Sequence, residues 1–334
     1  MIAGPKVRDN GLDDPRSWSA ASGAKDGALT REWTAPFPVD VRLTLSAQGR
    51  GAGDPTFQAD TAGAVWRTSL TPDGPGTIRV PPARPAPAGH RVLAYAWGPG
   101  AAWLLDALPA ALGAQDDISG FDPSPHPLLS EVASRHPGLR VGRTGRLMEA
   151  LVPAILEQKI LSLEAHRAWK ILLTKYGTPP PGPAPRGMRV FPPAKTWRAI
   201  PTWDWHRAGV EAVRAQTINR AASVASSLER LLTLTTAEAD RKLRTIPGIG
   251  PWTSAETRQR AIGDPDAVSV GDYNLPKAVG WALAGHPAAD DAIMLELLEP
   301  YKGHRHRVTR LVGMTGLRPP RRGPRLPVRD YRRF

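Results

Sequence analysis

The alternation of apolar and polar residues predicts a small sheet in the first third of the chain. Over 41–46 the apolar residues occupy every second position, which is the period of a half-buried strand. Further strands are expected at 64–71, 76–81 and 91–97. The apolar spacing becomes helical over 101–112. Together these segments predict a sheet-and-helix domain at 37–112.

The remainder of the chain has the apolar period of packed helices. A long run at three- and four-residue steps covers 144–176 and is followed by Gly177, a residue type that often ends a helix. Thr235 and Glu238 have the spacing of a capping box, which predicts a helix start at that point. Other helices are expected at 203–232, from Trp252 onward, and at 273–284. The pattern predicts a helical domain at 113–313.

Neither end of the chain has a clear period. Residues 1–36 mix Gly, Asp, Lys and Ser and are expected to form a flexible N-terminal arm. Residues 314–334 form a basic C-terminal tail, in which seven Arg and one Asp lie between Arg318 and Phe334. The tail either follows a polyanion electrostatically or adds solubility, and the sequence leaves both interpretations open.

Charge and composition narrow the range of partners. The 334 residues carry 44 Lys and Arg against 31 Asp and Glu, a formal net charge of +13. This excess favours a polyanionic partner, nucleic acid before a membrane surface. The absence of Cys excludes a disulfide framework, a thiolate zinc site, a Cys nucleophile and a Cys-ligated iron–sulfur cluster. The sequence has neither a bilayer-length apolar run nor a secretory pattern, so a cytoplasmic protein is expected.

A glycine-rich turn between two predicted helices is the most informative motif. One helix runs into Ile246, the turn is Pro247-Gly248-Ile249-Gly250, and a second helix starts near Trp252. The glycines allow a sharp turn, and the amides at the start of the next helix then form a cradle for a phosphate oxygen. Such contacts are independent of base sequence. The alternative is an ordinary helix–helix turn with no ligand.

A second motif follows the turn at a fixed distance. Twenty residues after Trp252, Gly271-Asp272-Tyr273 leads into another helix. The segments His136-Pro-Gly-Leu-Arg140, Ala154-Ile-Leu-Glu-Gln158 and Gly263-Asp-Pro-Asp-Ala267 accompany these motifs. In this order they resemble the helix-hairpin-helix DNA glycosylase superfamily, and within it the DNA-3-methyladenine glycosylase II group. The resemblance is good over about 100–313 and covers 37–99 only in outline.

The resemblance implies a fold and a reaction. The expected fold is α+β, with a small antiparallel N-terminal β-sheet domain (TBP-like) followed by an all-α helix-hairpin-helix glycosylase core. The expected function is monofunctional base excision repair, the hydrolysis of the N-glycosidic bond of alkylated purines such as 3-methyladenine and 7-methylguanine. The partner would be damaged double-stranded DNA, bound by a nucleoid-associated monomer. No cofactor and no metal are expected, although a monovalent cation at the hairpin stays open.

Asp272 is the expected catalytic residue. Cleavage of a glycosidic bond develops positive charge on the sugar, which a nearby ionised carboxylate stabilises. An Asp at the start of a helix is also a common N-cap, and the two roles are compatible. Bifunctional members of the superfamily such as endonuclease III have a Schiff-base lysine where this chain has Trp252. Because an indole cannot attack a sugar carbon, the resemblance implies no lyase step.

Four residues are candidates for the wall of a base pocket. Trp252 and Tyr273 are placed to stack on an extruded cationic base, although core packing explains them equally well. Glu256 lies one helical turn after Trp252 and is either a second pocket carboxylate or an exposed surface residue. His304 stands where a relative has an aromatic pocket residue. A metal pair of His304 and His306 is disfavoured by the arginines around it.

The expected DNA-binding residues are the hairpin and three polar side chains near it. These are Pro247, Gly248, Ile249, Gly250, Thr253, Gln158 and Lys159. Lys159 stands where an apolar residue that fills the gap left by a flipped base is expected; it either contacts a phosphate or is simply solvated. Two alternative functions stay open: a non-catalytic DNA-binding protein with this hairpin, and a glycosylase for another lesion such as uracil, hypoxanthine or an oxidised purine.

Overall fold

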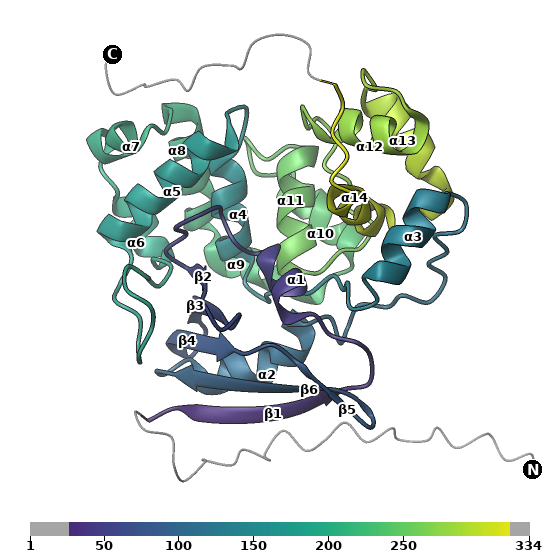
Figure 1. Cartoon of the computed structure of the whole chain (residues 1–334). Coiled ribbons are helices and arrows are strands. Elements are labelled where there is room, and N and C mark those ends of the chain that lie inside the picture. Colours follow the sequence, from purple (N-terminus) through teal and green to yellow (C-terminus); the bar gives the residue numbers. More distant parts are fainter. Residues whose placement is uncertain (1–26, 321–334) are drawn as a thin grey trace, which may run out of the picture.

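A six-stranded antiparallel sheet forms the base of the molecule in the computed structural model, which describes residues 27–320 (Figure 1). Its strands are β1 (Leu29–Ala35), β2 (Phe57–Ala59), β3 (Val65–Thr71), β4 (Gly74–Val80), β5 (Arg84–Ala86) and β6 (Gly89–Trp97). The order is β1-β6-β4-β3-β2, and β5 pairs with β6. Helix α2 (Ala101–Ala111) packs on this sheet and buries Leu104, Leu105 and Leu108 against it. The predicted sheet-and-helix unit is therefore present, while its likeness to TBP stays a prediction.

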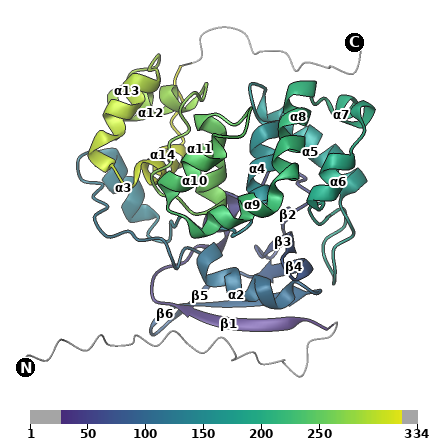
Figure 2. The same ribbon diagram turned by 180° about the vertical axis from the view of Figure 1, so that it is seen from behind.

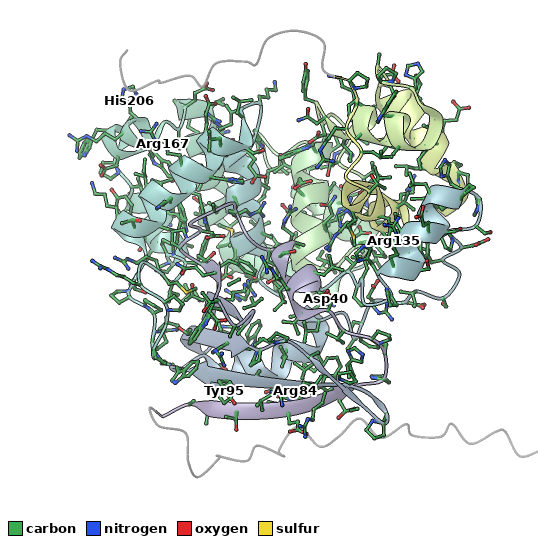
Figure 3. The ribbon with its side chains drawn as sticks, in the orientation of Figure 1. Asp40, Arg84, Tyr95, Arg135, Arg167 and His206 are labelled. Carbon is green, nitrogen blue, oxygen red and sulfur yellow. The ribbon has the colours of Figure 1, made fainter. Side chains whose placement is uncertain are left out.

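Two parts of the sheet domain differ from the sequence prediction. Residues 41–46 form helix α1 (Val41–Ser46) rather than a strand. The Asp40 side chain caps this helix by accepting from the Leu43 amide at 2.8 Å, and Val41 and Leu45, four residues apart, are both buried. Figure 3 shows Asp40 between the sheet and the helices above it.

The second difference concerns the predicted arm. Within residues 1–36, the segment Leu29–Ala35 forms β1 and pairs along its whole length with β6, from Leu29 opposite Ala96 to Ala35 opposite His90. The pairing partner lies about sixty residues away, so no local period reveals it. Residues 1–26 of the predicted arm lie outside the described residues.

The described chain after α2 is helical apart from an isolated bridge between Thr178 and Val190. Its helices are α3 (Pro127–Arg135), α4 (Leu147–Leu156), α5 (Ser162–Tyr176), α6 (Ala194–Ala199), α7 (Thr202–Ala208), α8 (Ala212–Ser223), α9 (Ala225–Glu229), α10 (Thr236–Leu243), α11 (Pro251–Ala261), α12 (Leu275–Ala284), α13 (Asp291–Leu298) and α14 (Arg305–Met314), with 3-10 turns η1 (Arg230–Thr233) and η2 (Glu299–Tyr301). The capping box at Thr235 and the helix end before Gly177 are confirmed. The predicted single run at 144–176 is wrong, because it consists of two helices separated by 157–161.

The helices form two groups with separate cores (Figure 2). The larger core contains buried residues from α4 through α11, among them Trp169, Trp197 and Ile218. The smaller core joins α3 with α12, α13 and α14 and includes Met294 and Val308. Because α11 faces one group and α12 the other, the loop between them crosses from the first to the second.

The described chain ends shortly after α14. Helix α14 ends at Met314, and the predicted basic tail beyond residue 320 lies outside the described residues. Among the residues described, no helix has the length and apolar character needed to cross a bilayer.

Candidate active site

The glycine-rich turn joins α10 to α11 in a tight hairpin. Gly248 has φ +98°, and a Cβ added there would lie 2.2 Å from Thr217 Oγ1. Glycine is therefore required at this position, both for the backbone angle and for the close approach of α8. Ile249 is 5% exposed and anchors the turn in the larger core, while Pro251 occupies the first turn of α11. The N-terminal end of α11 is left facing outward, where its amides and dipole favour an anion.

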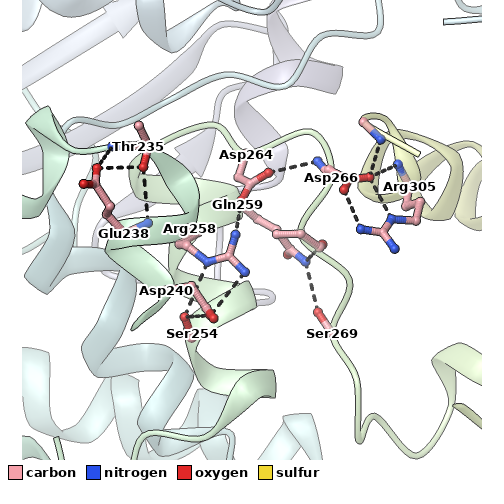
Figure 4. A network of polar contacts seen from close by, with 12 residues as sticks. Thr235, Glu238, Asp240, Ser254, Arg258, Gln259, Asp264, Asp266, Ser269 and Arg305 are labelled. Carbon is pink, nitrogen blue, oxygen red and sulfur yellow. Dashed lines mark hydrogen bonds and ion pairs between the residues drawn. The ribbon is translucent and has the colours of Figure 1, made fainter. Parts of the chain in front are cut away.

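A polar network holds the hairpin helices and the loop that follows α11 (Figure 4). Ser254 Oγ donates to Asp240 Oδ1 at 2.7 Å and so ties α11 to α10. Gln259 Nε2 donates to the Ala267 carbonyl at 2.8 Å and to Ser269 Oγ at 3.0 Å. Both Gln259 and Ser269 are buried, so these bonds fix the segment that runs from α11 to Asp272.

The Asp272 carboxylate is bound by three N–H donors from two elements. Oδ1 accepts from the amides of Asn274 and Leu275 at 2.7 and 2.8 Å, at the start of α12. Oδ2 accepts from the Trp252 indole Nε1 at 3.1 Å, on the first turn of α11. An ionised carboxylate, which only accepts, satisfies all three donors. The N-cap of α12 is Asn274 rather than Asp272, but Asp272 accepts from the two amides at the start of this helix, which fixes the carboxylate next to the hairpin.

A cavity of about 800 Å³ opens beside Asp272. Its lining comes from the end of α1, from α11, from the start of α12 and from α14. Polar and charged residues dominate: the lining includes Thr44, Ser46, Gln48, Glu256, Gln259, Arg260, Ser269, Asp272, Asn274, Lys277, His306, Thr309, Arg310 and Arg318. No Trp, Tyr or Phe of the described residues belongs to it.

The charged groups of the cavity form hydrogen bonds and ion pairs with one another and shift one another's pKa values. Glu256 accepts from Ser269 Oγ at 2.5 Å and from Arg260 Nη1 at 2.7 Å. Despite burial, the carboxylates of Glu256 and Glu157 raise the pKa of Arg260. Burial and the charges of Arg310 and Arg260 hold the pKa of His306 well below its usual range, so this imidazole is neutral at pH 7.

Of the four predicted pocket residues, Glu256 lines the cavity and the other three do not. Trp252 is half-buried and contacts Asp272 through its indole nitrogen. Tyr273 is 73% exposed, with Lys277 Nζ 3.4 Å from its ring centroid. The prediction for His304 does not fit the geometry, because this residue precedes α14 and is buried against Phe121, with ring centroids 5.4 Å apart.

The residues predicted to bind DNA divide into supporting and outward-facing groups. Gln158 Nε2 donates to the Gly248 carbonyl at 2.9 Å and to Thr253 Oγ1 at 2.8 Å, so it ties the 157–161 loop to the hairpin. Thr253 is 2% exposed and serves the same contact. Lys159 is exposed and is the single non-glycine residue with positive φ, 55°, in the described part of the chain.

Several cavity residues carried no usable sequence signal. Thr44 lies within the segment predicted as a strand, and Gln48 follows it. Because a strand was predicted there, the sequence did not indicate that α1 reaches the site. Nothing in the sequence around Arg260 and Arg310 distinguishes them from arginines on an exposed surface. His306 was considered only as a metal ligand, whereas its position on the first turn of α14 directs it to the cavity.

Sequence comparison finds relatives among DNA repair proteins. Two sequences from strains of Mycobacterium tuberculosis, each named a probable bifunctional transcriptional activator/DNA repair enzyme AlkA, are 32% identical to this chain over 175 residues. The match covers 51% of this chain and 33% of each relative, so it spans about a third of the length of these curated relatives. No protein-family model matches the chain.

Solved structures give the same fold. A 3-methyladenine DNA glycosylase from Archaeoglobus fulgidus has a TM-score of 0.69 at 17% identity, covering 84% of this chain and 97% of the other. An 8-oxoguanine glycosylase/lyase from Clostridium acetobutylicum has a TM-score of 0.63 at 13% identity, covering 86% and 96%. The chain therefore has the fold of the helix-hairpin-helix DNA glycosylases and resembles DNA-3-methyladenine glycosylase II.

Proposed function

We propose that this protein is a monofunctional DNA glycosylase of base excision repair that acts, as a monomer without a cofactor, on damaged duplex DNA. The observation that carries this proposal is the placement of Asp272 between the hairpin and a large cavity. The hairpin offers helix-terminal amides to a backbone phosphate, and the cavity has room for a single extruded base. The resemblance to repair glycosylases supports the same assignment.

The proposed chemistry follows from the carboxylate and its neighbours. As the bond between C1′ and the base nitrogen breaks, its electron pair leaves with the base and positive charge develops on the sugar. Asp272 stabilises that charge at short range, and water then adds to C1′. The proton that this water loses passes to a base that leaves as an anion, or to solvent where a cationic base leaves neutral. The indole of Trp252 keeps the carboxylate oriented during this step. An abasic site remains in the DNA.

The absence of a lyase step is proposed from the residue at position 252. A lyase needs an amine that attacks C1′ to form a Schiff base, and Trp252 offers none. Lys277 lines the cavity, but its ammonium lies over the exposed ring of Tyr273. Borohydride reduction traps a Schiff base covalently, so wild-type protein that became trapped on lesion-containing DNA would contradict this part of the proposal.

Two substrate classes are candidates. Alkylated purines, such as 3-methyladenine and 7-methylguanine, are favoured by the resemblance to 3-methyladenine glycosylases. Uncharged lesions, such as hypoxanthine, uracil or an oxidised purine, are favoured by the cavity, whose described lining includes many polar side chains and no Trp, Tyr or Phe. A cationic base gains most from aromatic faces, whereas an uncharged base gains most from hydrogen bonds.

The test is base release from a panel of duplexes that each contain one lesion. Wild-type protein is compared with Asp272→Asn, which keeps the size of the side chain but loses its charge and replaces one acceptor oxygen with an NH2 donor. We expect release of at least one base by wild type and a loss of about a hundredfold or more in the variant. Tight duplex binding without release from any lesion would instead support a non-catalytic DNA-binding protein.

A further inference from the structure

Three side chains around the cavity have polar atoms with no hydrogen-bond partner among the described residues. The atoms are Thr44 Oγ1, both polar atoms of the Gln48 amide and Nδ1 of His306, all shielded from solvent. Thr44 is 2% exposed. A shielded, unpaired polar group costs roughly 1–3 kcal/mol. Three such groups around one cavity indicate that they are kept for a ligand rather than for stability.

Rotation about a single side-chain bond changes which atoms of each of these residues face the cavity. In Thr44 a change of rotamer carries the hydroxyl to the position that the methyl group or the hydrogen held. In His306 a half-turn of the ring exchanges a carbon with Nδ1, and in Gln48 the terminal amide turns about its last side-chain bond. The side chains already line the cavity, so no backbone movement is needed.

The backbone beneath Thr44 and Gln48 is fixed by arginines of the opposing helices. Arg260 Nε donates to the Ala47 carbonyl at 3.0 Å, and Arg310 Nη2 donates to the Leu43 carbonyl at 3.0 Å. These two bonds hold the last turn of α1 against α11 and α14. A rigidly held element of this kind presents its side chains with little loss of freedom on binding.

The loop after Gln48 is also fixed by polar contacts, like the last turn of α1. Arg50 is buried and forms an ion pair with Glu157 at 3.3 Å. Asp54 accepts from the Arg50 amide at 2.7 Å and from the Trp169 indole at 2.8 Å. The sheet domain thus contributes a braced segment to the cavity of the helical domain.

We propose that Gln48, assisted by Thr44 and His306, reads the hydrogen-bonding edge of an uncharged damaged base in this cavity. The inference rests on the proposed glycosylase function. A glutamine amide presents an acceptor oxygen and a donor nitrogen side by side, which match an N–H next to a carbonyl on a base edge. Hypoxanthine and uracil carry such a pair, and Thr44 and His306 supply further groups for the remaining edge atoms.

The charged residues that line the cavity disfavour a cationic base. Arg260 is paired with Glu256, but Arg310 forms no ion pair within residues 27–320. Burial, together with Arg260 and Arg307, lowers the pKa of Arg310 to about 10, which still leaves it charged at pH 7. A base with a positive ring would be repelled by Arg310, whereas an uncharged base is not. The geometry thus favours the second of the two substrate classes.

The test measures duplex binding and base release in parallel. Asp272→Asn protein is titrated with a first pair of duplexes. One contains hypoxanthine, and the other contains purine, which lacks the carbonyl and the N–H of hypoxanthine. A second pair contains uracil and 2-pyrimidinone, and 7-methylguanine represents a cationic base. We expect at least one uncharged lesion to bind about tenfold more tightly than its analogue without the carbonyl and the N–H. The 7-methylguanine duplex should bind no more tightly than the analogue duplexes. Adding Gln48→Leu reduces the preference to less than about threefold.

Matched variants separate reading of the base from general damage. Gln58→Leu makes the same change on β2, away from the cavity, and should keep the full preference. Thr44→Val replaces only the hydroxyl, with a methyl group of similar size, and tests the proposal even if Gln48→Leu fails to fold. His306→Phe removes both ring nitrogens. Thermal unfolding of each variant shows whether it is folded.

The outcomes distinguish this inference from the proposed function. A preference that survives Gln48→Leu and Thr44→Val, or tighter binding of 7-methylguanine, overturns the inference, while base release by wild type still supports the glycosylase. A preference that depends on Gln48 without base release from any lesion supports the reading role and overturns the glycosylase. If no duplex is preferred and no base is released, both the inference and the proposed function are overturned.

Discussion

The indole Nε1 of Trp252 donates to Asp272 Oδ2 across 3.1 Å, joining the first turn after the hairpin to the carboxylate at the start of α12. The two residues lie twenty positions apart in the sequence. This bond couples the element that we propose holds DNA to the group that we propose stabilises the sugar. It also gives position 252 a role other than stacking on the base.

Trp252→Phe tests that coupling. The phenyl ring fills most of the same space but donates no hydrogen bond, so the Asp272 carboxylate loses one of its three N–H donors. A hydrogen bond to a charged group contributes about 1.5–3 kcal/mol, and we expect single-turnover base release to fall at least about tenfold. Binding of undamaged duplex should not change. An equal loss of binding and release would instead mean that the ring contacts DNA.

The two glycines of the hairpin should respond differently to alanine. Gly248→Ala forces a Cβ against Thr217 at positive φ, so we expect the free energy of unfolding to fall by at least about 1–2 kcal/mol. At Gly250 φ is −95° and an added Cβ meets nothing within 4 Å, so Gly250→Ala should fold normally. Its methyl group narrows the approach of a phosphate.

We therefore expect Gly250→Ala to bind all duplexes about tenfold more weakly, with an unchanged unfolding midpoint. Binding is measured by fluorescence anisotropy on damaged and undamaged duplexes, and stability by thermal unfolding. A loss confined to damaged duplex would show that the hairpin does not act as a sequence-independent phosphate site.

Lys159→Gly should separate backbone strain from charge. Lys159 has φ 55°, which costs a non-glycine residue about 1–2 kcal/mol, so glycine should not lower the free energy of unfolding. If the ammonium contacts a phosphate, the slope of log affinity against log salt concentration falls by about one. Lys159→Ala removes the same charge without relieving the strain and serves as the control. An unchanged salt slope would exclude the phosphate contact.

Glu157 makes stability depend on pH. Although burial opposes it, the Arg50 guanidinium and a hydrogen bond from His166 lower the pKa of Glu157 from 4.5 to about 2. The folded pKa lies below the unfolded value, so its stabilising contribution is complete above about pH 5.5 and is lost as pH falls. We expect the stability advantage of wild type over Glu157→Gln to shrink by about 2 kcal/mol between pH 7 and pH 3.

Urea unfolding at each pH measures this difference. Glu296→Gln, at an exposed position on α13, is the control and should differ from wild type by the same amount at every pH. A gap between wild type and Glu157→Gln that did not vary with pH would mean that the ion pair with Arg50 does not persist in solution.

Local sequence determined the features whose causes are local. Gly248 specifies a turn because its φ of +98° is an angle that residues with a side chain rarely adopt. The capping box at Thr235 forms because its two partners are three residues apart. Asp272 before α12 was recognisable for the same reason, since the two amides that donate to its carboxylate lie two and three residues ahead.

Tertiary structure decided everything that depends on distant partners. Residues 41–46 became a helix because Asp40 caps them and Val41 and Leu45 meet the core together, which outweighs the alternating pattern. Residues 29–35 became a strand because β6 is there to pair with them. The start of α14 places His306 in the cavity and His304 outside it.

The cavity itself is the clearest case. Its lining combines Gln48 with Glu256 and Arg310, residues that lie more than two hundred positions apart at the extremes. Nothing in a local window records that α1 lies against α11 and α14, because the bonds from Arg260 and Arg310 to its carbonyls exist only once the chain has folded. The sequence alone therefore determined the hairpin and its Asp, and the packing of α1 against α11 and α14 determined which residues line the cavity beside them.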